Sequence, residues 1–129
     1  MISLENAELL TQVVQEIAYT APEGWKKIVY YQEMLADSDG SLRNKSTAKC
    51  WCDTEMSEYS RGFEIGGSME AFEAVEEFYE DTKRKGEAWK GMLLTIFEDG
   101  KYNTQLFYDT TPLLDGESEK VDEIISSAE

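Results

Sequence analysis

Histidine is absent from this sequence, and cysteine and proline are scarce, with two residues of each among 129. The lack of histidine excludes Ser-His and Cys-His nucleophilic catalysis and removes the commonest metal ligand. The two cysteines, Cys50 and Cys52, share one predicted strand, which is a poor geometry for a disulfide. With no further Cys or His they cannot complete a tetrahedral zinc site. No metal or cofactor is therefore expected, and reduced thiols point to the cytoplasm.

Long apolar runs and basic residues are also in short supply. No segment is long and apolar enough to span a membrane, and residues 1–10 lack the basic and apolar blocks of a secretory signal. Twelve basic residues against 27 acidic ones give a net charge of −15 and a pI near 4.3. Such a charge repels nucleic acid and anionic lipid and attracts a basic partner. Plain solubility is the alternative explanation.

What is present is enough apolar material for one compact domain over residues 1–129, since 41% of the chain is hydrophobic. Apolar residues at helical spacing predict helices over 3–18 and 68–85, the second ending in Lys83, Arg84 and Lys85 before Gly86. Aromatic and β-branched runs predict strands over 25–35, 44–53 and 60–65. Residues 115–129 end the chain as either a third helix or an acidic tail.

The stretch "EAWKGMLLTIFEDGKYNTQLFYD" (87–109) predicts a β-hairpin with two possible registers. A two-residue turn would place Ile96 opposite Asn103, so each apolar residue would share a face with an amide. A three-residue loop with Gly100 in a left-handed bulge instead pairs Phe97 with Lys101 and Ile96 with Tyr102. The bulged register gathers the apolar side chains on one face, and a one-residue slip would cost roughly 1.5–3 kcal/mol per large side chain.

Together these elements predict an α+β fold with the order α-β-β-β-α-β-β-α. We expect a two-layer arrangement, in which two long helices cover one face of a mostly antiparallel, four- to five-stranded sheet.

Candidate binding residues are acidic and aromatic. The four acids Glu70, Glu73, Glu77 and Glu80 recur at steps of three and four and form an acidic stripe on the second helix, with Glu76 and Asp81 beside it. Asp37 and Asp39 add acid in a turn. Trp51, Phe97 and Phe107 fall on the other face of the sheet, where they would anchor a partner if uncovered. The alternatives are a solvated helix face for the acids and a covering C-terminal segment for the aromatics.

Four ordered segments carry a family resemblance: a helix ending before Trp25, the strand "WKKIVYYQEML", the helix "SMEAFEAVEEFYEDTKRKG" and the hairpin "W-x-x-M-x-L-x-I-x-x-x-G-K-Y-x-x-x-L-x-Y-D" from Trp89 to Asp109. Over about residues 8 to 112 the chain resembles the YezG-like immunity proteins of bacterial polymorphic toxin and contact-dependent inhibition systems. The resemblance implies a cytoplasmic antitoxin that neutralises a cognate toxin C-terminal domain, commonly a nuclease, and has no catalytic residues of its own.

Two other functions fit the sequence. One is an acidic interaction module that regulates another basic protein, and the other is a small hydrolase that uses paired carboxylates. The leading hypothesis is an immunity protein whose acidic surface covers the active site of a basic nuclease, without contact to nucleic acid or membrane.

Overall fold

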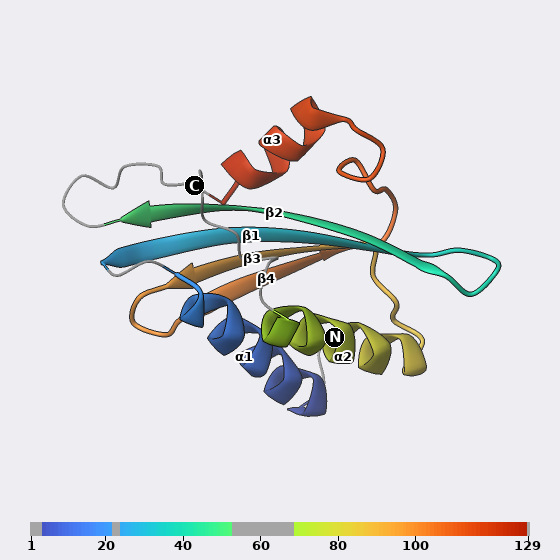
Figure 1. Cartoon of the computed structure of the whole chain (residues 1–129), viewed down its shortest axis with the longest axis horizontal. Helices are drawn as coiled ribbons and strands as arrows, with labels where there is room; N and C mark the ends of the chain where they lie inside the picture. Colours follow the sequence, from blue (N-terminus) through green and yellow to red (C-terminus); the bar gives the residue numbers. More distant parts are fainter. Residues whose placement is uncertain (1–3, 22–23, 53–68, 129) are drawn as a thin grey trace.

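The computed structural model describes residues 4–21, 24–52 and 69–128, which form three helices and a four-stranded sheet (Figure 1). In chain order the elements are α1 (Leu4–Tyr19), β1 (Trp25–Ala36), β2 (Leu42–Cys52), α2 (Met69–Arg84), β3 (Gly91–Phe97), β4 (Tyr102–Phe107) and α3 (Ser118–Ser126). The predicted α+β class is confirmed, and the C-terminal segment forms a helix. The predicted strand 60–65 lies outside the described residues.

The sheet is antiparallel throughout, with the strand order β2-β1-β3-β4. β1 and β3 are central, whereas β2 and β4 are the edges. β1 is buried from Ile28 to Met34. Its nearly continuous apolar and aromatic sequence is typical of a strand that is covered on both faces, because there is no solvent side to favour alternating polar residues.

The larger part of the core lies between the sheet and the two long helices, which pack side by side on one face (Figure 1). Leu10, Val13, Val14 and Ile17 of α1 are all at most 5% exposed, as the helical spacing predicts. Trp89, just before β3, is 1% exposed and packs against two aromatic residues of α2. Its ring centroid lies 6.1 Å from that of Phe78 and 5.3 Å from that of Tyr79.

The hairpin of β3 and β4 has the predicted bulged register. Phe97 N–H donates to the carbonyl of Lys101 at 2.9 Å, and Ile96 faces Tyr102. Gly100 has a φ of 90°, which an L side chain rarely adopts, so glycine is the residue that suits this position. Met92, Leu94 and Ile96 consequently all point into the helix-side core.

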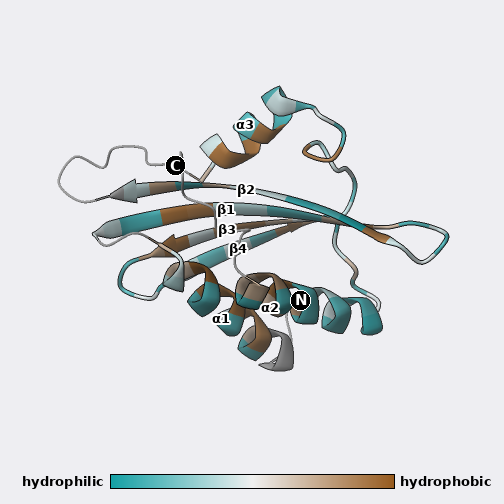
Figure 2. Cartoon of the chain, in the orientation of Figure 1, coloured by the Kyte–Doolittle hydropathy of each residue, from teal (hydrophilic) through white to brown (hydrophobic). Residues whose placement is uncertain are grey.

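The short helix α3 crosses the opposite face of the sheet and adds a partial third layer to the two that were expected (Figure 1). Its buried side chains Val121 and Ile125 pack with Val29, Tyr31 and Leu93 of the central strands. The hydrophobic stretches of α3 and of the strands beneath it are visible in Figure 2. The sheet therefore has apolar cover on both faces.

A buried carboxylate fastens the segment that leads to α3. Glu33 of β1 is fully buried. Its two oxygens accept hydrogen bonds from the N–H groups of Leu113 and Leu114, at 2.9 and 2.7 Å, and from the Tyr31 hydroxyl at 2.6 Å. Burial, reinforced by the bond to Glu33, raises the pKa of Tyr31 far above its ordinary value, so the phenol stays a proton donor. We call this group of bonds the Glu33 clasp.

Candidate functional site

The exposed face of α2 gathers carboxylates while its opposite face is apolar. Ala71, Ala74, Val75, Phe78 and Tyr79 are buried against the core. The predicted stripe residues Glu70, Glu73, Glu77 and Glu80 are all exposed, as is Glu76 beside them. We refer to these five carboxylates as the acidic face. α1 and α2 together carry nine carboxylates against two basic residues, so the whole helical layer is strongly negative.

The acidic face has little local compensation. Within the part of the chain that the structure describes, the carboxylates of Glu73, Glu76, Glu77 and Glu80 form no ion pair. Like charges at i, i+3 and i, i+4 cost a helix a few tenths of a kcal/mol each. The helix tolerates that cost because its buried face supplies the stability.

Asp81 was expected beside the stripe, and this position is wrong. Its side chain is 1% exposed and is held by Arg84 at 2.9 Å and Lys85 at 3.0 Å. The hydrogen bond from Lys85, with further bonding and charge from Arg84, lowers the pKa of Asp81 below its ordinary value. Arg84 in the last turn of α2 and Lys85 directly after the helix are thus bound to a buried acid, and within the described residues neither forms an ion pair with Glu73, Glu76, Glu77 or Glu80.

A shallow hollow lies where α2 meets α1. It has a volume of about 390 Å³ and is lined by Leu9, Glu76, Glu77, Glu80 and Arg84. Three carboxylates of the acidic face therefore border a depression with an apolar side chain in it. Such a surface offers a cationic side chain both charge and a place for its methylene groups.

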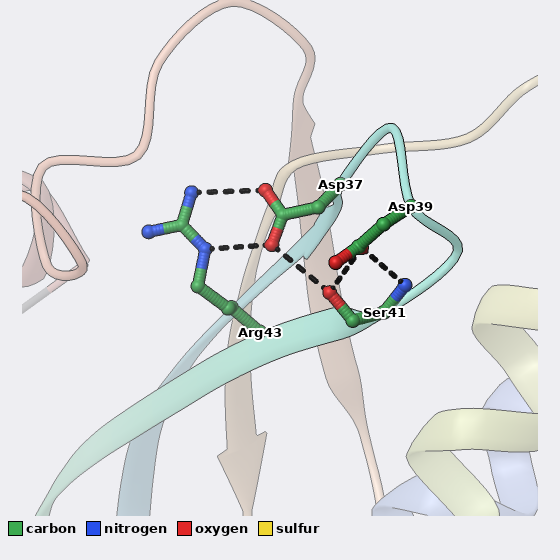
Figure 3. A network of polar contacts seen from close by, with 4 residues as sticks. All are labelled: Asp37, Asp39, Ser41 and Arg43. Carbon is green, nitrogen blue, oxygen red and sulfur yellow. Dashed lines mark hydrogen bonds and ion pairs between the residues drawn. The ribbon is translucent and has the colours of Figure 1, made fainter.

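Asp37 and Asp39 are committed to their own turn between β1 and β2 (Figure 3). Arg43 binds both oxygens of Asp37 through Nε and Nη2, at 3.1 and 3.2 Å. Asp39 accepts hydrogen bonds from the hydroxyl and N–H of Ser41, at 2.6 and 2.9 Å, and these bonds lower its pKa. These two predicted binding residues therefore belong to a hydrogen-bonded turn between β1 and β2 and not to α2. The charge of Asp37 is already paired with that of Arg43.

The three aromatic candidates do not form one open patch. Trp51 and Phe97 flank Lys27, whose Nζ lies 5.4 and 6.0 Å from their ring centroids. Phe107 lies at the other end of β3, opposite Gly91, and its ring packs edge-on against Tyr31 at 6.2 Å. Trp51 and Phe107 both pack against the cluster that contains Val121 and Ile125 of α3. For Trp51 and Phe107 the structure therefore shows the alternative in which the C-terminal segment covers them, whereas Phe97 is partly exposed and is not part of that cluster.

Sequence reasoning missed Glu33, the residue that anchors the C-terminal segment. The available signal was a single acid inside the apolar run "IVYYQEML", where an unpaired charge would be costly. Sequence reasoning also missed Gly91. The absence of a side chain at Gly91 leaves room for the Tyr31 phenol on the neighbouring strand.

The described residues contain no group of three or more His, Cys, Asp or Glu side chains arranged to hold a metal ion. None of the helices in that part of the chain is long and apolar enough to cross a membrane. No protein-family model matches the chain, and no curated protein matches it.

Proposed function

We propose that this chain is a cytoplasmic immunity protein that binds a cognate basic toxin domain, a nuclease, and blocks its active site with the acidic face of α2. The observation that supports the proposal is that four exposed carboxylates on α2, those of Glu73, Glu76, Glu77 and Glu80, form no ion pair with a described residue. The resemblance of the hairpin and helices to the YezG-like immunity proteins supplies the biological context.

The spacing of the acidic face suits a groove built for nucleic acid. Ten residues separate Glu70 from Glu80, which is about 15 Å along a helix. Five carboxylates over that length lie on average about 4 Å apart along the helix axis, comparable to the one phosphate per ~3.4 Å of a nucleic-acid strand. Carboxylates that dock in a phosphate groove would also speed association with the toxin, because complementary charge raises association rates.

The direct test is co-expression with the toxin domain encoded beside this gene. We expect cells to survive and a complex to be recovered. Death of the co-expressing cells together with absence of a complex would end the proposal. A toxin gene directly next to this one would also separate an immunity protein from an acidic module that regulates some other basic protein, since the charge of α2 supports both.

The surface is tested by neutralising Glu73, Glu77 and Glu80 with glutamine. At low ionic strength we expect the association rate to fall by about 10-fold or more and its salt dependence to flatten. The matched control changes Glu119 and Glu123 to Gln and Asp122 to Asn in α3, which alters the net charge by the same amount at another exposed site. Equal rate losses in both triple variants would mean that net charge alone matters and the acidic face does not dock the toxin.

A further inference from the structure

The two edges of the sheet are protected very differently. β2 carries Arg43, Lys45 and Lys49, and charged residues of this kind discourage pairing with another strand. β4 is six residues, "YNTQLF", with no charge and no proline. Among the described elements no strand pairs with its outer side. β4 is therefore an edge without the usual protection against a further strand.

The register of the hairpin fixes which backbone groups of β4 point outward. Because Phe97 N–H bonds to the carbonyl of Lys101, the odd-numbered residues of β4 bond to β3. The N–H and C=O groups of Tyr102, Thr104 and Leu106 consequently point to the open side. The side chains of Tyr102 and Leu106 are partly exposed, whereas their partners on β3, Ile96 and Met92, are 1% exposed or less.

The charges that flank β4 are complementary to themselves. Lys101 precedes the strand and Asp109 follows it by two residues, and both are exposed. In an antiparallel pair of two β4 strands centred on Gln105, continuing the register past the strand ends sets each Lys101 opposite the other copy's Asp109. In the same register Tyr102 lies opposite Tyr108 and Thr104 opposite Leu106, so the outward backbone groups meet as hydrogen-bonded pairs. A parallel pair would instead set Lys101 beside Lys101.

We propose that this chain pairs with a second copy of itself through β4, antiparallel about a two-fold axis at Gln105. The two sheets then form one continuous sheet, and the contact is isologous, as a two-fold axis requires. The opposite charges of Lys101 and Asp109 favour this register over others. Their attraction also opposes the repulsion between two chains that each carry a net charge of −15. The proposal does not depend on the identity of the toxin.

A disulfide across the axis tests the register. Gln105 would face its own copy in a non-hydrogen-bonded pair, with Cα atoms about 4.5 Å apart, which a disulfide can bridge. We expect Gln105→Cys to give a covalent dimer on mild oxidation. The matched control is Asn103→Cys, also exposed on β4, whose copies would lie about 13 Å apart. The parent chain, with Cys50 and Cys52, controls for the native thiols. Equal cross-linking of both variants would overturn the register.

A charge exchange tests the contact without cysteine. Sedimentation equilibrium should show the parent chain at twice its 14.7 kDa as its concentration rises. Asp109→Lys sets lysine opposite lysine at both ends and should weaken association by about 10-fold or more, although it lowers the overall repulsion. Lys101→Asp combined with Asp109→Lys restores opposite charges and should restore the dimer. A parent chain that stays monomeric near 1 mM refutes self-pairing, as does a dimer unaffected by Asp109→Lys. A monomer whose β4 is instead protected from hydrogen exchange by the toxin would assign this edge to the toxin, and would also overturn the proposal.

Discussion

Replacing Glu33 with alanine tests whether the Glu33 clasp holds the C-terminal segment on the sheet. The substitution removes the acceptor of three hydrogen bonds, from Leu113 N–H, Leu114 N–H and the Tyr31 hydroxyl. A buried donor without a partner costs about 1–3 kcal/mol. Because three such donors lose their acceptor, we expect Glu33→Ala to lower the free energy of unfolding by about 3–6 kcal/mol.

The matched control is Glu98→Ala, which removes a carboxylate from a half-exposed ion pair with Lys26 at 2.9 Å. Exposed pairs of this kind contribute about 0–1 kcal/mol. Urea unfolding followed by tryptophan fluorescence and circular dichroism measures both variants. With a slope of about 2 kcal/mol per molar urea, a loss of 4 kcal/mol moves the midpoint by about 2 M.

Hydrogen exchange at the amides of Leu113 and Leu114 shows where the loss occurs. These two amides should exchange much faster in Glu33→Ala, while amides in the centre of β3 keep their order of protection. A midpoint for Glu33→Ala that coincides with that of Glu98→Ala would refute the reasoning. Unchanged protection of Leu113 and Leu114 would refute it as well.

Three further substitutions have expected outcomes. Gly91→Ala would place its Cβ 2.8 Å from the Tyr31 hydroxyl oxygen and should destabilise the fold by about 1–3 kcal/mol in urea unfolding; adding Tyr31→Phe should recover part of the loss, and an additive double variant would contradict the contact. The bond from Lys85 lowers the folded-state pKa of Asp81, so the stability that it adds is present above about pH 4 and is lost as the pH falls further. Asp81→Asn should therefore reduce the dependence of the unfolding free energy on pH in that range. An unchanged pH dependence would contradict a stabilising interaction between Asp81 and Lys85. Gly86→Ala, at a φ of 79°, should cost about 1 kcal/mol by thermal unfolding, and a neutral result would show that the backbone relaxes there.

The sequence predicted those parts of the fold that depend on local patterns. Apolar spacing placed α1 and α2, and the chemistry around Gly100 selected the register of the hairpin, because a slip would have exposed a whole row of side chains. It also placed Glu70, Glu73, Glu77 and Glu80 on the exposed side of α2, since helical periodicity alone decides which face is buried.

Contacts between distant segments could not be predicted in the same way. Even within α2, helical periodicity leaves Asp81 at the edge of the buried face and does not show that Arg84 and Lys85 bind its buried carboxylate. The position of α3 depends on Glu33, which lies 80 residues before Leu113 in the chain. No local sequence pattern predicts a contact between residues 80 positions apart. The sequence alone therefore could not decide whether the segment containing α3 covers Trp51 and Phe107.

The order of the elements has a consequence for the nascent chain. α3 is the last of the described elements in the chain, so the sheet can form before α3 docks on its outer side. Until α3 docks, Val29, Tyr31 and Leu93 lack the apolar cover of Val121 and Ile125, and a chaperone that recognises exposed apolar strands would bind there.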